Sequence, residues 1–512
     1  MNNSRSRNSV KNIGYSLGFQ IVTILSSFIM KTLFIKTLGI QYTGVSTLFT
    51  DILTVLSVAE LGFSTAIAYA LYRPLSDNDT LQISKIMNVY KWVYRCVAGG
   101  ILLMGICCIP FLGFLVKDVP DIKENIALIF FLFVFKTSCS YLLIYKATLL
   151  EANQQKNIVH KISIVFLVYS TTIESVILLV FNNYLLYLII SVINEILKNF
   201  IISKYSEKKF PLLKQPCTEK LSKPERKEMF GNVRALALYK ISWALQKGLD
   251  SIVISALLGT GMVGFLSYYK LIVNNIDRLF GQVFEAMKPS VGNLAASETP
   301  DKQHEVFNFM SVASFAIGNF ISVALLVLIN PFIEIWLGKE YLLGMDIVCI
   351  LTVNTYILTM VRPYECFRLA NGLFVQGKYR PVIMFIINLG LAIPFAWWWG
   401  IFGVLLATVV SRVTTHVWYD PWLIYKHVFH RPFINYILKR SLYLCIVAAN
   451  CAATFFVCCF INTGAIYVDF IIKFFICTLL PNGIFWLLFH KTPEFKQGKM
   501  YVKSLIKRKK KI

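Results

Sequence analysis

Charged residues are scarce in this chain. They make up 15% of its 512 residues, whereas 56% are hydrophobic and the mean hydropathy is +0.62. A soluble protein of this size carries roughly 25% charged residues. The shortage excludes an ordinary soluble enzyme and leaves room for about fourteen bilayer-spanning helices of about 20 apolar residues each.

Sequence signatures of metal and nucleotide chemistry are also missing. The 12 cysteines include no C-x-x-C with a matching His or Cys pair, so we expect no metal site. No glycine loop that could cradle a phosphate is present, which argues against nucleotide hydrolysis, and we expect no cofactor. These absences favour a membrane transporter over an enzyme.

Polar residues divide the chain into apolar stretches that predict an all-α polytopic membrane protein of about fourteen transmembrane helices. These helices are expected to begin near residues 13, 44, 88, 125, 158, 183, 230, 261, 305, 343, 381, 401, 434 and 465. A membrane barrel would show short alternating segments instead of runs such as Ile126 to Phe135.

The chain has 51 basic and 27 acidic residues, and the positions of the basic residues indicate its orientation in the membrane. With fourteen spans, 38 of the 51 Lys and Arg residues fall on the side of the two termini and only five fall opposite. Lys and Arg in short loops mark the cytoplasmic side. We therefore expect both termini in the cytoplasm and anionic membrane lipids, not nucleic acid, as the partner of these charges.

A weak internal repeat predicts two lobes. Leu38, Gly39 and Gly44 recur at an offset of 220, and a second echo links Gln154 and Lys156 to positions 222 residues further on. We expect two six-helix lobes in parallel orientation. The predicted parts are an N-terminal lobe at 1–204, a cytoplasmic linker at 205–228, a second lobe at 229–430, two extra helices at 431–490 and a basic tail at 491–512.

Polar side chains recur at helical spacing inside several apolar stretches. Ionisable groups at membrane depth are costly and are therefore functional candidates. The stripes are Ser16, Gln20, Thr23, Ser27 and Lys31; Lys240, Trp243, Lys247 and Asp250; and Lys270, Asn274, Asp277 and Arg278. They favour a cationic chamber suited to a diphosphate. The alternative is structural pairing, of Lys247 with Asp250 and of Lys270 with Asp277.

Two stretches carry a resemblance to a known family. Residues 36–75, KTLGIQYTGVSTLFTDILTVLSVAELGFSTAIAYALYRPL, and residues 257–280, LLGTGMVGFLSYYKLIVNNIDRLF, resemble the polysaccharide-biosynthesis flippases of the Wzx type. Their superfamily includes peptidoglycan lipid flippases and multidrug and toxin exporters. The resemblance implies two lobes around a central cavity, alternating access, and an undecaprenyl-diphosphate-linked oligosaccharide of O-antigen or capsule type as cargo.

The resemblance also implies a bacterial cytoplasmic membrane and partners among the glycan polymerases or glycosyltransferases of the same pathway. The expected substrate-binding residues are Lys31, Lys240, Lys247, Lys270, Gln20, Trp243 and Asn274. The expected ion-coupling acids are Glu60, Glu174, Asp250 and Asp277.

Two other functions remain open. A cation-coupled multidrug exporter of the same fold would require an acidic chamber. A membrane glycosyltransferase or polymerase would require a large external loop bearing acids, and the predicted outer connections are short.

Overall fold

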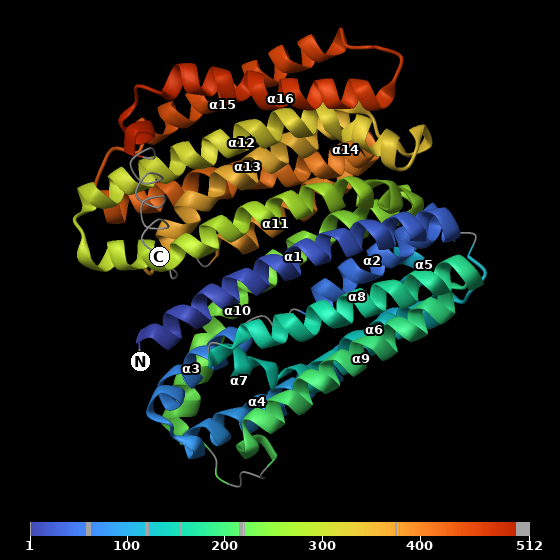
Figure 1. The fold of residues 1–512 in the computed structure, drawn as a ribbon, viewed down its shortest axis with the longest axis vertical. Coiled ribbons are helices and arrows are strands. Elements are labelled where there is room, and N and C mark those ends of the chain that lie inside the picture. Colours follow the sequence, from blue (N-terminus) through green and yellow to red (C-terminus); the bar gives the residue numbers. More distant parts are fainter. Residues whose placement is uncertain are drawn as a thin grey trace. The chain divides into compact units, whose positions relative to one another are not determined.

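The chain folds into helices throughout its described part (Figure 1). The computed structural model describes residues 2–57, 63–117, 122–153, 155–214, 219, 221–373, 376–377 and 379–497. At 2–13, 17, 63–66, 68–69, 227–240, 242–243, 247, 286, 289 and 296 it describes the backbone without the side chains. The predicted all-α polytopic fold is confirmed.

The chain forms two compact units, divided between Ser267 and Tyr268. This division falls inside a helix, whereas the sequence analysis begins a second lobe at residue 229. The predicted lobes are parts that would move as rigid bodies, whereas the compact units are defined by contacts between residues. The limits of the lobes therefore stay a prediction.

The first unit packs its helices around two aromatic cores. Its helices are α1 (Asn2–Leu38), α2 (Ile40–Leu56), α3 (Phe63–Asp77), α4 (Thr80–Cys108), α5 (Leu112–Leu115), α6 (Ile126–Ile144), α7 (Ala147–Ala152), α8 (Lys156–Phe181), α9 (Tyr184–Lys209), α10 (Lys223–Leu258) and the start of α11 (Thr260–Ser297). Helix α1 packs on α8, α6 on α4 and α9, and α2 on α10. One core holds Phe49, Phe130 and Tyr184, and the other holds Tyr90 and Tyr94.

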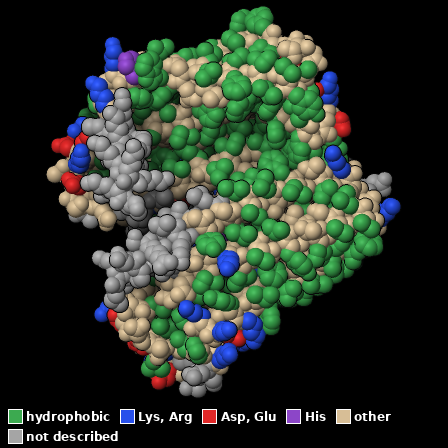
Figure 2. Space-filling model, in the orientation of Figure 1, with side chains coloured by type: hydrophobic (Ala, Val, Ile, Leu, Met, Phe, Trp, Pro, Cys, Tyr) green, Lys and Arg blue, Asp and Glu red, His purple; other side chains and the backbone are tan. Residues whose placement is uncertain are grey.

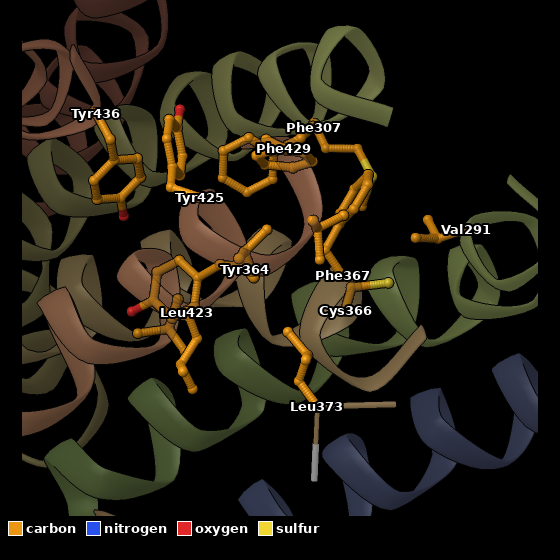
Figure 3. Close-up of a cluster of buried hydrophobic side chains, with 14 of the residues drawn as sticks. Val291, Phe307, Tyr364, Cys366, Phe367, Leu373, Leu423, Tyr425, Phe429 and Tyr436 are labelled. Atoms are coloured by element: carbon orange, nitrogen blue, oxygen red, sulfur yellow. The ribbon is translucent and has the colours of Figure 1, made fainter. Parts of the chain in front are cut away.

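The second unit is built around α12. It comprises the rest of α11, α12 (Pro300–Trp336), α13 (Met345–Ala370), α14 (Arg380–Ile424) with a π-turn (Tyr425–Phe429), α15 (Ile434–Cys459) and α16 (Ile466–Phe489). Helix α12 contacts α13, α15 and α16. Figure 3 shows part of its core, where Phe307, Tyr425 and Phe429 pack against one another. The two predicted extra helices, α15 and α16, are therefore docked on this unit.

Helix α14 is two antiparallel helices joined by a sharp turn. Gly400 has φ 58° and ψ −136°, which only glycine adopts readily. Asn388 and Thr408, twenty residues apart, share a hydrogen bond at 3.3 Å. A Cβ at Gly403 would lie 1.9 Å from the carbonyl oxygen of Phe395. The structure thus contains the two helices predicted to begin near residues 381 and 401.

Several helices begin earlier than predicted because polar residues cap them outside the apolar stretch. Asp79 accepts a hydrogen bond from the backbone of Gln82 and starts α4 at residue 80, where the sequence analysis expected 88. Ser222 and Glu225 form a capping box that starts α10 at residue 223, where it expected 230. The hydrogen bonds from the Ser222 hydroxyl and backbone lower the pKa of the Glu225 carboxyl.

Ten segments of the described chain are long and apolar enough to cross a membrane. The longest, Arg380–Phe429, is the segment that Gly400 divides into two helices. Hydrophobic side chains also cover broad parts of the described surface on the face in Figure 2. Large apolar residues such as Trp397, Trp398 and Phe460 are exposed on the surface of the protein. Such a surface suits hydrocarbon, and the chain is a multi-pass membrane protein.

The packing of α4 on α6 gives a test of the fold. A Cβ at Gly105 would lie 2.4 and 2.6 Å from the two Cγ atoms of Val134. We expect Gly105→Ala to destabilise the protein by about 1–3 kcal/mol through overpacking. Thermal unfolding in detergent measures this, and Val134→Ala in the same chain should restore part of the loss.

Gly100→Ala is the matched control, because it lies in the same helix with nothing within 4 Å of its Cβ position. Equal unfolding temperatures for the Gly105 and Gly100 variants would contradict the packing described here.

Candidate functional site

A cavity of about 440 Å³ lies in the first unit between α2, α6, α9 and α10. Its wall is rich in hydroxyl groups and holds one lysine and one glutamate. The lining residues are Thr50, Leu53, Thr54, Ser57, Phe133, Lys136, Thr137, Ser140, Tyr141, Glu195 and Ala244. Because α6 and α9 are candidate membrane spans, this polar wall lies between membrane-spanning helices. Its volume is within the range of about 300–1,000 Å³ that small-molecule sites occupy.

The lysine of the cavity is held by polar groups of α9. Lys136 Nζ donates a hydrogen bond to Ser191 Oγ at 2.5 Å. Glu195, one turn further along α9, accepts hydrogen bonds from Lys198 Nζ at 2.7 Å and from Asn199 Nδ2 at 3.0 Å. Glu195 also acts electrostatically on Lys136. The wall therefore carries a cation, Lys136, and an anion, Glu195, whose ion-pair partner is Lys198.

Glu174 of α8 belongs to the same electrostatic cluster. It acts on Lys136, its side chain is 9% exposed, and it accepts a hydrogen bond from Asn194 Nδ2 at 3.5 Å. A buried carboxylate is costly unless it is paired or hydrogen-bonded. Glu174, an expected ion-coupling acid, thus lies close to a lysine that lines the cavity.

The polar stripe of α1 makes a hydrogen bond to α8 and others within its own helix. Ser16 Oγ lies 3.0 Å from His160 Nε2 of α8, and Gln20 is 6% exposed. Thr23 and Ser27 donate to carbonyl groups of their own helix. The structure thus places most of the stripe in contact with protein groups.

Lys31 lies at the end of this stripe. Its Nζ donates to Thr47 Oγ1 of α2 at 3.2 Å, and Asp51 of α2 acts on its charge. Lys31 therefore has an acid near it, as Lys136 does.

The predicted residues of α10 are only partly described. Asp250 is 8% exposed, and its neighbour Gly248 packs on the backbone of Asp51. The side chains of Lys240, Trp243 and Lys247 lie outside the described residues. Glu60 also lies outside them.

The predicted residues of the second unit lie along α11. Asp277 forms an ion pair with Arg362 of α13, with Oδ1 and Nη2 2.7 Å apart. The sequence analysis considered Lys270 as the partner of Asp277. Lys270 is half-buried and Asn274 is exposed. Asp277 thus links α11 to α13 through this ion pair.

A buried ion cluster ties α13 to both halves of α14. Asp420 Oδ2 lies 3.3 Å from Arg368 Nε, 3.1 Å from Arg380 Nη1 and 3.4 Å from His416 Nε2. Asp420 is fully buried and the two arginines are at most 5% exposed. The sequence analysis singled out none of these four residues. The spacing of His416 and Asp420, four residues apart in an apolar stretch, was the available signal.

Among the described residues, no group of three or more His, Cys, Asp and Glu side chains could hold a metal ion. The polar clusters above instead combine basic side chains with one or two acids each. Paired ionisable groups at membrane depth are candidates for a functional role.

The sequence has no match among family models, and no curated protein matches it significantly. Solved structures do share its architecture. The lipid II flippase MurJ in an inward closed conformation has a TM-score of 0.67 at 15% identity, over 93% of this chain and 99% of MurJ.

Transporters of the MATE family are similar as well. An inward-facing multidrug resistance MATE transporter of the MOP superfamily has a TM-score of 0.59 at 12% identity, over 78% of this chain and 93% of its own. A point mutant of the Vibrio cholerae MATE transporter VcmN has a TM-score of 0.55 at 14% identity, over 86% of this chain and 100% of its own. The chain has the fold of these membrane proteins.

The buried ion cluster gives a stability test. Asp420→Asn leaves two buried guanidinium groups without a carboxylate, and we expect a loss of about 3–5 kcal/mol in the free energy of unfolding. Asp301→Asn removes the carboxylate of an exposed pair with Arg431, and we expect little change. Thermal unfolding in detergent compares the two variants. Similar losses in both would show that Asp420 does not neutralise the arginines.

Proposed function

We propose that this chain is a flippase that moves an undecaprenyl-diphosphate-linked oligosaccharide from the inner to the outer leaflet of a bacterial cytoplasmic membrane by alternating access. The observation that carries the proposal is the hydroxyl-rich cavity at Lys136 and Glu195, between membrane-spanning helices of a MurJ-like fold. The resemblance of residues 36–75 and 257–280 to Wzx-type flippases supports the same cargo class.

The cavity wall suits a sugar. Thr50, Thr54 and Thr137 donate their hydroxyl hydrogens to carbonyl groups of their own helices, so their oxygen lone pairs can accept hydrogen bonds from sugar hydroxyls. Phe133 and Tyr141 offer ring faces on which a sugar ring can pack. Sugars and phosphates cannot cross hydrocarbon unaided, so a wall of this kind gives them a polar path while the polyprenyl tail stays in the lipid.

The diphosphate of the cargo needs cations. Lys31 and Lys136 are two described lysines of the first unit that contact its polar groups, and each has an acid near it. Lys240 and Lys247 of α10, and Lys270 of α11, remain predicted contributors. Lysine ammonium groups bind phosphate as point charges.

The acids supply a link between ion binding and cargo binding. A proton or metal cation that neutralises Glu174 or Glu195 weakens their hold on Lys136, which then becomes available to a phosphate. Because linkage is reciprocal, cargo on Lys136 also favours the ion on the acids. Asp250 is buried in the same unit and is a further coupling candidate, while Asp277 is engaged by Arg362 and Glu60 remains a prediction.

A cation-coupled multidrug exporter is the second candidate. The similarity to MATE transporters favours it, and so does the presence of Glu195 in the cavity wall. An exporter would confer resistance to cationic toxic compounds, whereas a flippase would not. Glycan polymerases or glycosyltransferases of the same pathway are the proposed protein partners of a flippase.

Complementation of a deletion strain tests the function. Wild-type protein should restore surface glycan and clear the lipid-linked precursor from the inner leaflet. We expect Lys136→Gln to cut glycan display strongly because it removes the cavity's cation, and the double change of Lys240 and Lys247 to Gln to abolish display. Surface glycan and lipid-linked precursor are both quantified.

The matched control changes Lys208 and Lys209 to Gln. These exposed residues end α9, so the same charge is lost outside the membrane. Normal display in the Lys136 variant would remove that residue from the cargo site. A deletion strain with unchanged glycan but heightened sensitivity to cationic drugs would favour the exporter.

The proposed orientation places both termini in the cytoplasm. In intact cells, a membrane-impermeant maleimide should label a single cysteine at residue 182, in the turn between α8 and α9. It should label one at residue 215, in the α9–α10 connection, only after the cells are opened. The native cysteines are replaced first. The reverse pattern would overturn the orientation.

A further inference from the structure

The first turns of α2 and α11 meet backbone to backbone. A Cβ at Gly44 would lie 2.1 Å from the carbonyl oxygen of Thr260, and a Cβ at Gly264 would lie 2.7 Å from that of Ile40. Real Cβ atoms do not approach other atoms closer than about 3 Å, because dispersion turns to steep repulsion below contact distance. This contact therefore exists only because both positions are glycine. All four residues lie in the first compact unit.

The contact is reciprocal. Gly44 meets Thr260 and Gly264, and Gly264 meets Ile40 and Gly44. Residues 40 and 44 are separated from 260 and 264 by 220, the offset of the repeat found in the sequence. A contact in which i meets j and j meets i is the mark of a two-fold relation. The two turns are thus equivalent turns of the two repeats, facing each other.

The entry to each turn is equivalent as well. Gly39 precedes α2 with φ 91°, and Gly259 precedes α11 with φ 103°. Both backbone conformations favour glycine. The two glycine positions of the repeat are therefore explained by the geometry of this contact and of the turns that lead into it.

Hydrogen bonds join the α10–α11 turn to the end of α5 and the residues after it, beside this contact. Ser255 Oγ donates to the carbonyl of Leu115 at 2.7 Å, and Thr260 Oγ1 donates to that of Lys117 at 3.3 Å. Lys117 Nζ in turn donates to the carbonyl of Leu257 at 2.9 Å. In each of these hydrogen bonds a side chain donates to a backbone carbonyl. At a membrane surface, water can readily take the place of either partner.

We infer that the Gly44–Gly264 contact is a seal that closes the outer end of the transport path and opens once in each cycle. The inference rests on the proposed function, which puts the α1–α2 and α10–α11 turns on the outer side. Small residues let helices approach closely without interlocking side chains, so such a contact closes tightly and parts without repacking. The close contact between α2 and α11 also gives a reason why the first compact unit extends through α10 to Ser267.

Alanine substitutions at the two glycines test the seal. Gly44→Ala and Gly264→Ala should each hold the turns apart, leave a folded and monodisperse protein in detergent, and reduce glycan display. A cysteine at Ser267, which is 5% exposed and one turn below Gly264, should react several-fold faster with an external maleimide in either variant. The measurement uses a chain whose native cysteines have been replaced.

Two features of this experiment separate a seal from ordinary packing. Gly261→Ala lies in the same turn of α11 with nothing within 4 Å of its Cβ position, so labelling and display should stay at wild-type values. The double variant should be no worse than either single one, because each change alone breaks the same contact.

Every outcome bears on the seal. Folded variants with unchanged labelling would overturn it. Loss of the folded protein in both single variants would also overturn it, because folding cannot depend on an interface that separates in each cycle. Labelling is measured in cells without the glycan pathway too. A rise in labelling there, together with normal glycan in the deletion strain, would support the seal and reject the proposed cargo.

Discussion

A polar group in hydrocarbon must find its partner inside the protein, because no water is present to bind it. This constraint accounts for the polar contacts of both units. Lys136 is held by Ser191, Glu195 is paired with Lys198, Asp277 is paired with Arg362, and Asp420 is paired with two arginines. The described basic groups of these clusters all have an acid near them. A charged cargo must therefore compete for its binding site, and this competition gives the acids a part in transport.

The positions of the helices were largely predictable, because a long run of hydrophobic residues marks a segment that crosses the lipid. The division of α14 at Gly400 was predicted from the two stretches on either side of it. Helix ends were less predictable. Helices α4 and α10 continue into polar sequence, where Asp79 and the Ser222–Glu225 box decide the first turn. A hydropathy pattern does not contain that local hydrogen bonding, so it placed both starts about two turns late.

The site was predictable only as far as single helices allow. Helical spacing placed Asp250 on a polar stripe, and the structure buries both Asp250 and Glu174, whose part in ion coupling stays a prediction. Helical spacing could not supply partners. Asp277 pairs with Arg362, 85 residues away, and Asp420 brings together Arg368 and Arg380 from two other segments. The glycine repeat shows the same limit, since the sequence revealed the echo of Gly44 in Gly264 but not that the two touch.

The two kinds of helix contact differ in what separation would cost. Parting Asp420 from Arg368 and Arg380 would leave buried charges without partners, which costs several kcal/mol, so that cluster suits helices that stay together. Parting Gly44 from Gly264 separates no ion pair, and water can replace the hydrogen bonds beside the contact, which run from Ser255, Thr260 and Lys117 to backbone carbonyls. A transporter that obeys the partner constraint in every state of its cycle must place its ion pairs where helices remain in contact. It must place apolar, side-chain-free contacts where helices part, and the turns of α2 and α11 have that character.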